Sequence, residues 1–382
     1  MRSQHLFSRS QVTDFNILKD PKQIIYIGML TSDQEAERYR EYSIAGNNLQ
    51  NKFIRVSNPD ETINIKPTSL TDRTSDLTNY GFSLGVLMQR IVRVFRYLAT
   101  ITKTIFKLYK SIKKQSRPIT VFYNVDYYNF LLIQLAFLLR SKIIIIAADY
   151  VSPPRTFLDR LFLMPYRQAD GVIKLRKNND FLGQNLLLTA IVDPNHGFDC
   201  LDIGAKNVLY SGSIGYTTGL EIIIEAACKL PDVTFNISGP LFDLSSEDFY
   251  KRIKAARSSG GDVKYHGVLQ NDEYLQLLRR CEIALSMRNP EDPDHNNNFP
   301  SKIADYFNNS RCVVSSIAYE ELSKDSYVFS DFTSNDLSKV IRRLFDDESI
   351  IFAYGKKGYE FAQQEFSLNV SRRRLRRFIN EI

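Results

Sequence analysis

Short runs of β-branched and other apolar residues alternate along the chain with longer stretches of helical periodicity. The runs of the first half cover residues 24–27, 119–123, 142–147 and 171–175, and those of the second half cover 208–211, 234–238, 263–265, 283–286 and 312–315. Continuous apolar runs of this length are typical of parallel strands that are buried on both faces. The pattern predicts an α/β protein of two doubly wound, Rossmann-like domains, with ligands beyond the carboxyl ends of the strands.

The length of the chain also favours two domains, because 382 residues exceed the size at which one hydrophobic core keeps growing. Pro194, Gly197 and Gly204 interrupt the alternating pattern, so we place the boundary there. The prediction is a first domain over 1–192, a second over 205–360, and a C-terminal helix over 361–382 that packs back toward the first domain. A cleft should separate the two domains.

One segment of the first half, residues 84–117, has an apolar stripe at helical spacing and no acidic residue. Its many lysines and arginines indicate contact with anionic lipid headgroups. The other interpretation is that the stripe packs on the sheet while the lysines are solvated, and we favour it for the apolar face. No nucleic-acid-binding module accompanies the charge, so no nucleic-acid partner is expected. The predicted membrane contacts are Arg93, Arg96, Lys103, Lys107, Lys110 and Lys114.

The overall composition is that of a soluble globular protein, with 43% hydrophobic and 24% charged residues. No run of 18 uncharged apolar residues occurs, and the first residues have no apolar signal core. We therefore expect a cytoplasmic protein that is peripheral on the inner face of the cytoplasmic membrane. The four cysteines are widely spaced, and neither HExxH nor CxxC is present, so no metal site is expected.

The segment 297–306, Asn-Asn-Phe-Pro-Ser-Lys-Ile-Ala-Asp-Tyr, carries the most informative chemistry. Pro300 suits the first turn of a helix, where the amides of the next three residues would point at an anion. Lys302 would add charge, and Asp305, one turn further on, could accept a hydrogen bond from a ribose hydroxyl. The alternative, an ordinary capped helix, is about equally supported by this segment alone.

Five elements of the second half occur in an order that resembles a known family. They are the strand, glycine loop and helix at 208–226, the strand and turn at 235–240, the strand and loop at 263–269, the arginine loop at 284–290, and the helix start at 299–306. This series is similar to the retaining glycosyltransferases of GT-B architecture, specifically family 4, which builds bacterial surface polysaccharides. The first half has only a thin resemblance.

The resemblance implies a metal-independent hexosyltransferase that moves a sugar, with retention, from a nucleotide-diphosphate sugar to a saccharide acceptor, which we expect to be polyprenyl-linked. Arg288 and Lys302 would stabilise the departing diphosphate and are the catalytic candidates. Asp126 and Asp149, which follow first-domain strands, are the candidates for orienting the acceptor. No cofactor is expected. The residues assigned to donor binding are Gly212, Ser213, Gly239, His266, Gly267, Val268, Phe299, Pro300, Ser301 and Asp305.

Two departures from the family pattern leave other functions open. Asn297 stands where the family has the first of two glutamates, and Ser213 and Thr218 replace a basic pair in the first glycine loop. One alternative is a degenerate protein that acts as a membrane-surface partner of an active transferase. Another is a basic membrane-binding protein without catalysis. Glycoside hydrolysis is set aside, because no motif brings two acids together.

Overall fold

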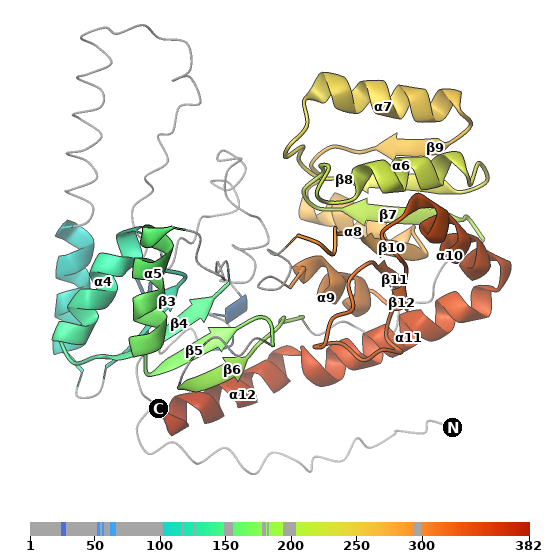
Figure 1. Ribbon diagram of the computed structural model, residues 1–382. Coiled ribbons are helices and arrows are strands. Elements are labelled where there is room, and N and C mark those ends of the chain that lie inside the picture. Colours follow the sequence, from blue (N-terminus) through green and yellow to red (C-terminus); the bar gives the residue numbers. More distant parts are fainter. Residues whose placement is uncertain are drawn as a thin grey trace, which may run out of the picture.

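The computed structural model describes residues 24–27, 52, 53, 56, 62–65, 102–115, 118–125, 127–148, 156–177, 181, 183–193, 204–292 and 299–382. Within these ranges the chain forms two six-stranded parallel sheets, each with helices on both faces (Figure 1). The prediction of two Rossmann-like domains is confirmed. All nine predicted strands are present, each within one residue of its expected ends.

The first sheet has the strand order β2-β1-β3-β4-β5-β6. Its strands are β1 (Ile24–Ile27), β2 (Thr62–Ile65), β3 (Ile119–Tyr123), β4 (Lys142–Ala147), β5 (Gly171–Lys174) and β6 (Gln184–Leu187). Alternate residues of the strands pack on opposite faces, so that Ile143 and Ile145 contact one layer of helices while Ile144 and Ile146 contact the other. The first layer contains a helix over residues 102–113, α4 (Tyr127–Leu138) and α5 (Phe157–Gln168).

The predicted basic helix over 84–117 needs a correction at its end. Residues 84–101 lie outside the described residues, and the helix stops at residue 113 rather than 117. Its chain then turns, with the amide of Gln115 donating to the carbonyl of Ile112, before Pro118 and the strand that follows. Leu108 and Ile112 are buried against the sheet. The apolar stripe of the described part is therefore a packing face, as the favoured interpretation predicted.

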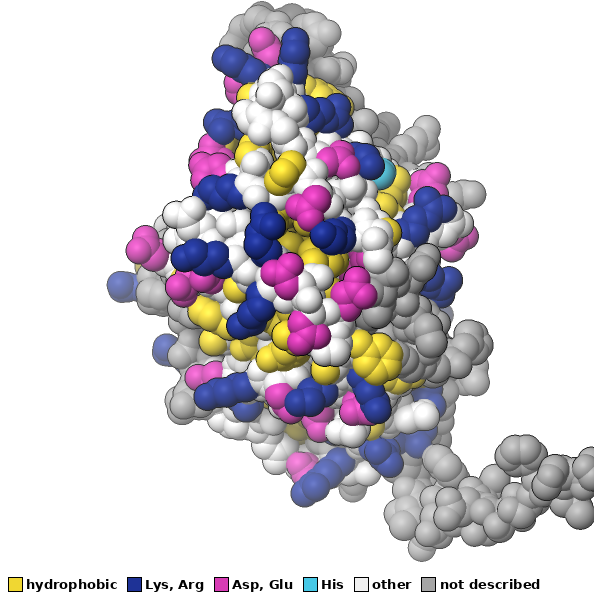
Figure 2. All heavy atoms as spheres, turned by 90° about the vertical axis from the view of Figure 1, so that its right-hand side faces the viewer, with side chains coloured by type: hydrophobic (Ala, Val, Ile, Leu, Met, Phe, Trp, Pro, Cys, Tyr) yellow, Lys and Arg dark blue, Asp and Glu magenta, His cyan; other side chains and the backbone are white. Residues whose placement is uncertain are grey.

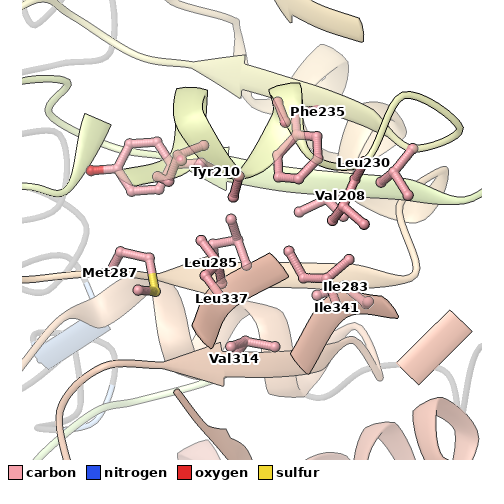
Figure 3. Packing of buried hydrophobic residues seen from close by; sticks show 14 of the residues in the cluster. Val208, Tyr210, Leu230, Phe235, Ile283, Leu285, Met287, Val314, Leu337 and Ile341 are labelled. Atoms are coloured by element: carbon pink, nitrogen blue, oxygen red, sulfur yellow. The ribbon is translucent and has the colours of Figure 1, made fainter. Parts of the chain in front are cut away.

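The second sheet has the strand order β12-β11-β10-β7-β8-β9. Its strands are β7 (Asn207–Ser211), β8 (Thr234–Ser238), β9 (Asp262–Tyr265), β10 (Ile283–Ser286), β11 (Cys312–Ser315) and β12 (Val328–Phe329). The helices are α6 (Leu220–Cys228), α7 (Ser246–Ser258), α8 (Asn271–Arg279), α9 (Ser301–Asn308), α10 (Ser334–Asp346) and α11 (Glu348–Glu365). On one face, Val208, Ile283 and Leu285 of the strands pack against Leu337 and Ile341 of α10 (Figure 3).

The other face of the second sheet joins the two domains. Leu175, Ala190 and Val192 of the first domain share one buried cluster with Phe299 and Tyr306 of the second. Nearby, Glu321 pairs with Arg176 at 3.1 Å and also accepts the amide of Lys177. A buried acid held by an arginine and an amide fixes geometry, since removing one partner leaves an uncompensated charge. These contacts fix how the two domains sit against each other.

The predicted helix over 361–382 is divided in the structure. Residues 361–365 complete α11, and a separate helix, α12 (Leu368–Glu381), follows. The break occurs where Val192 of the first domain accepts the amide of Leu368 and donates its own to the carbonyl of Phe366. Beyond it, Leu375, Phe378 and Ile379 pack on the face of the first sheet opposite α4 and α5. The chain thus ends on its first domain (Figure 1).

Candidate functional site

Three glycines, Gly212, Gly239 and Gly267, follow β7, β8 and β9, and together we call them the glycine rim. All three have left-handed backbone angles, with φ of 119°, 139° and 70°. The amide of Gly212 donates to Ser238 at 3.0 Å, and that of Gly239 donates to Gly267 at 2.8 Å. A Cβ atom on Gly239 would lie 1.9 Å from the carbonyl oxygen of Gly212. The rim therefore brings three turns into backbone contact, and at Gly239 there is no room for any other residue.

The loop that begins at Gly212 has two exposed residues at its start and is held in place by a hydrogen bond from a buried tyrosine. Gly212 and Ser213 are exposed, while the hydroxyl of buried Tyr210 donates to the carbonyl of Ser213 at 2.9 Å. Burial raises the pKa of Tyr210 to about 12, so its hydroxyl stays a donor. Thr218 bonds both the amide and the carbonyl of Gly215. The residue that replaces a basic one in the family pattern thus stabilises the loop.

Lys302 lies directly beneath this loop. Its Nζ donates to the carbonyl of Ser211 at 3.0 Å, lies 4.2 Å from the centroid of the Tyr210 ring, and would be 3.8 Å from a Cβ on Gly212. Among the described residues it has no carboxylate within ion-pair distance. Burial, and then the charge of Arg288, hold the pKa of Lys302 well below its usual value. An anion at this position would restore the charged form.

Arg288 brings a second positive charge to the same edge. It follows β10, and its backbone is fixed by Ser316, whose hydroxyl accepts the Arg288 amide at 2.8 Å and donates to the Arg288 carbonyl at 2.7 Å. The arginine is half-buried and acts on the pKa values of Lys302 and Tyr210. Two cations beside exposed loop amides form a site suited to a diphosphate.

The start of α9 differs in detail from the prediction. Pro300 is the N-cap rather than a residue of the first turn, and Ser301 begins the helix. The amide of Ile303 donates to the carbonyl of Pro300 at 3.0 Å, so it is not available to a ligand. Of the three predicted amides, those of Ser301 and Lys302 remain candidates. The positive end of the dipole of α9 therefore lies at Lys302, the second residue of the helix.

Phe299 has a packing role that corrects its assignment as a donor contact. Its side chain is 6% exposed, and its ring centroid lies 5.3 Å from that of Tyr319 and 6.2 Å from that of Phe366. The ring thus belongs to the cluster that joins the domains. The sequence motif located the helix start to within one residue but could not show where this side chain points.

Asp305 makes a contact that the sequence did not predict. Its Oδ1 lies 3.5 Å from the Nζ of Lys52, a residue of the first domain. The side chains of Lys52 and Asp305 are 22% and 40% exposed, so the pair is a partly solvated ion pair of at most about 1 kcal/mol. A lysine of the other domain therefore holds the carboxylate that we assign to a ribose hydroxyl. A ligand that engages Asp305 would compete with Lys52.

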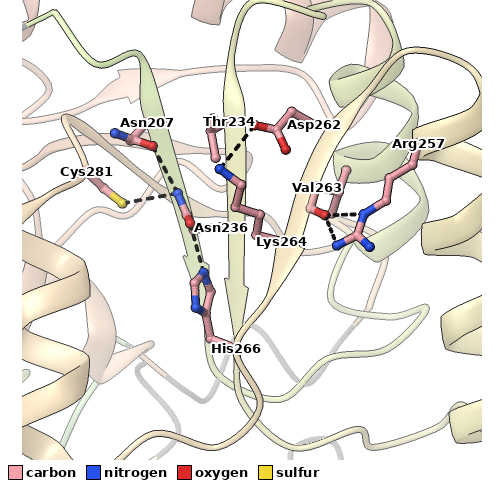
Figure 4. A network of polar contacts seen from close by, with 9 residues as sticks. All are labelled: Asn207, Thr234, Asn236, Arg257, Asp262, Val263, Lys264, His266 and Cys281. Atoms are coloured by element: carbon pink, nitrogen blue, oxygen red, sulfur yellow. Dashed lines mark hydrogen bonds and ion pairs between the residues drawn. The ribbon is translucent and has the colours of Figure 1, made fainter.

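His266 follows β9, and its ring is engaged by the protein itself (Figure 4). Its Nε2 lies 2.9 Å from Oδ1 of Asn236, whose amide nitrogen donates to Asn207 and Cys281. Since that amide already uses its nitrogen as donor, Nε2 of His266 carries the proton. Burial, and then Lys264, lower the pKa of His266. The contact with Asn236 fixes the orientation of the histidine ring, and Val268, two residues further on, is exposed.

The remaining predicted residues lie elsewhere. Asp126, Asp149, Arg93 and Arg96 fall outside the described residues. The structure brings together a second set that sequence reasoning missed, namely Tyr210, Ser316 and Lys52, none of which stands in a recognisable motif. The four predicted membrane lysines that are described are all exposed on or just after the helix over 102–113: Lys103, Lys107, Lys110 and Lys114.

Comparison with known proteins gives the fold. No protein-family model and no curated protein matches the chain. Anabaena HepE, solved in complex with UDP and glucose, is similar with a TM-score of 0.67 and 13% identity, over 94% of this chain and all of that one. The fold is GT-B. Sucrose-phosphate synthase from Thermosynechococcus elongatus has a TM-score of 0.61 and 14% identity over 94% of this chain and 98% of its own.

A third similar structure is a glycosyltransferase from Rickettsia africae ESF-5. It has a TM-score of 0.62 and 12% identity and covers 94% of this chain and 98% of its own. Identities of 12 to 14% establish the arrangement of the elements. The chemistry of this chain has to be argued from the site that its own residues form.

Proposed function

We propose that the chain is a metal-independent, retaining hexosyltransferase of the family 4 type, which uses a nucleotide-diphosphate sugar as donor. The observation that carries the proposal is the position of Lys302, a half-buried cation without a carboxylate partner among the described residues, directly beneath the exposed glycine loop. A cation that has lost part of its hydration and lies beside exposed amides is stabilised by a bound anion. The UDP complexes of HepE, on the same fold, support a nucleotide as that anion.

In this proposal, different residues contact different parts of the nucleotide-sugar donor. Lys302 and Arg288 meet the diphosphate together with the amides of Gly212 and Ser213, while Asp305 receives the ribose and Val268 lies beside the base. The acceptor hydroxyl attacks C1 of the sugar from the side on which the diphosphate departs. As the bond from C1 to the phosphate oxygen breaks, the acceptor proton passes to that phosphate. The protein contributes mainly by stabilising the charge that develops on the leaving group, so no metal is required.

We further propose that the acceptor is a polyprenyl-linked saccharide used in surface polysaccharide biosynthesis, at the inner face of the cytoplasmic membrane. The exposed lysines of the helix over 102–113 support contact with anionic headgroups. None of the described helices combines the length and the apolar composition that crossing a bilayer requires. The competing proposal, a degenerate partner of an active transferase, is favoured by the loss of the basic pair at Ser213 and Thr218.

Calorimetric titration with UDP, GDP, ADP and CMP tests the donor site. We expect one of the four to bind with a micromolar Kd, and the Arg288→Ala variant to bind it about tenfold more weakly, because one of two cations is lost. Transfer from the matching radiolabelled nucleotide sugar separates an enzyme from a degenerate partner. Absence of binding by all four nucleotides would contradict the donor site itself.

Replacing Lys52 with methionine tests the competition at Asp305. We expect about two- to fivefold tighter binding of the nucleotide, since an ion pair worth up to about 1 kcal/mol no longer has to be broken. Binding of inorganic pyrophosphate, which has no ribose, should stay unchanged. Lys357→Met removes a similar ion pair, to Asp325 at 3.1 Å, and serves as the control. Weaker nucleotide binding in Lys52→Met would instead assign Lys52 to the ligand.

A further inference from the structure

Three helices form one outer surface of the first domain: residues 102–113, α4 and α5. Their inner sides carry Leu108, Leu132 and Tyr166 into the cluster beneath the sheet. Figure 1 shows all three on the side of the first sheet that points away from the second domain. We call the outward side of these helices the outer face. No other described element covers it.

The outer face is unusually rich in exposed hydrophobic side chains. Seven of the thirteen large hydrophobic side chains that are exposed in the described chain belong to these three helices. The helix α4 is the least polar of the three, because none of its twelve residues is charged. Its Leu138 is 80% exposed, and Leu131, two turns earlier on the same side of the helix, is exposed as well. A surface helix without charges is a poor fit to water and needs an apolar partner.

The other two helices continue this surface. At the start of α5, Phe157 is 78% exposed, and Leu158 and Met164 are exposed beyond it. On the helix over 102–113, Phe106 is 64% exposed and Tyr109 is exposed as well. Rings of Phe130 and Phe162, with centroids 5.8 Å apart, join α4 to α5. The exposed apolar groups therefore stand on helices that are packed into one layer.

Positive charge borders the apolar groups. Lys103, Lys107, Lys110 and Lys113 are exposed on the same helix as the two aromatic residues, and the Nζ of Lys113 lies 6.0 Å from the ring centroid of Tyr109. Asp159 is the one acidic residue in the three helices. The opposite end of the molecule differs, because Figure 2 shows lysine and arginine side chains interspersed with aspartate and glutamate there. The excess of positive charge on the outer face is therefore not shared by that end of the molecule.

We propose that the outer face inserts into the surface of an anionic phospholipid bilayer. The lysines contact phosphate headgroups, and the apolar side chains of α4 and α5 enter the boundary between headgroups and acyl chains. Interfacial helices bind in this way, with aromatic and aliphatic groups below a basic border. A second copy of the chain does not fit, since pairing two outer faces would bring like charges together. The proposal extends the lysine contact of the proposed function and does not depend on sugar transfer.

Vesicle co-sedimentation tests insertion. It compares the parent, as the full chain, with a triple variant that carries Phe106→Gln, Leu138→Gln and Phe157→Gln. The matched control is Tyr250→Gln, Phe329→Gln and Phe352→Gln, which removes exposed hydrophobic groups from the second domain. With vesicles of phosphatidylglycerol and phosphatidylcholine, we expect the outer-face variant to partition at least about tenfold more weakly and the control to partition normally. The parent should stay partly bound in high salt, where attraction by lysines alone is screened.

Three results would overturn the proposal. One is normal partitioning of the outer-face variant, and another is complete release of the parent in high salt, which would leave adsorption by lysines alone. The third is a parent dimer in solution that the same variant converts to a monomer. Nucleotide binding by the outer-face variant, measured in parallel, should equal that of the parent. Its loss would show a folding defect, and the double variant Leu138→Gln with Phe157→Gln then repeats the test.

Discussion

Replacing Lys302 with methionine is expected to weaken nucleotide binding about 100-fold, which corresponds to about 3 kcal/mol. The substitution keeps the length of the side chain and removes the charge that lies beneath Gly212 and Ser213. Its Nζ has the carbonyl of Ser211 and the Tyr210 ring as protein partners, and neither neutralises it. A diphosphate would be the neutralising group, so its affinity should depend strongly on this lysine.

Stability distinguishes this role from a structural one. Keeping a lysine charge away from water costs free energy, and the lowered pKa of Lys302 reflects that cost. Lys302→Met should therefore be at least as stable toward urea as the parent, even though it binds nucleotide weakly. A variant that loses stability and binding together would mark Lys302 as a structural residue. Lys339→Met, a change on α10, serves as the control for both measurements.

The same lysine sets an expected pH dependence. Burial lowers the pKa of Lys302 in the free protein, and a bound diphosphate raises it again by favouring the charged form. Between these two pKa values, binding takes up a proton, so affinity should fall as pH rises through the lowered pKa and stay flat below it. Titrations in buffers of different ionisation enthalpy measure the uptake. In Lys302→Met, the proton uptake on binding should be smaller by the amount that Lys302 contributes in the parent.

The central strands were predictable because a strand that is buried on both faces consists of a continuous run of mainly apolar residues. β4, with four consecutive isoleucines, and β10 show this directly. The missed strands are β2, β6 and the two-residue β12. β2 and β6 are the edges of the first sheet, and β12 is an edge of the second. The sequence of β6, Gln-Asn-Leu-Leu, is half polar because an edge strand is partly solvated. Local pattern alone does not separate such strands from loops.

The candidate site was partly predictable for a topological reason. Parallel strands end at one edge, so Gly212, Gly239 and Arg288 had to lie near each other once their strands were identified. The pairing of Lys52 with Asp305 was not predictable, because it depends on how two separately folded domains are placed. The direction of a single side chain was also beyond the motif, as Phe299 shows. Motif spacing locates the backbone of a site better than it assigns its side chains.

Replacing Gly239 with alanine is expected to destabilise the second domain by about 3 kcal/mol or more. The new Cβ would lie 1.9 Å from the carbonyl oxygen of Gly212 and 2.8 Å from its carbonyl carbon. Both are backbone atoms, so a whole loop has to move. The φ of 139° adds strain for any residue that has a Cβ. The smaller entropy of the unfolded alanine chain offsets at most about 1 kcal/mol of this cost.

Gly260→Ala is the matched control, because Gly260 also has a positive φ, 92°, but its Cβ would meet nothing within 4 Å. We expect that variant to lose only about 1 kcal/mol and to bind nucleotide normally. Urea unfolding and calorimetry on both variants separate backbone strain from the collision. Since the collision displaces the loop above Lys302, Gly239→Ala should also bind nucleotide at least about tenfold more weakly. Equal stability and equal binding in the two variants would show that β7 and β8 do not meet at the glycine rim as described.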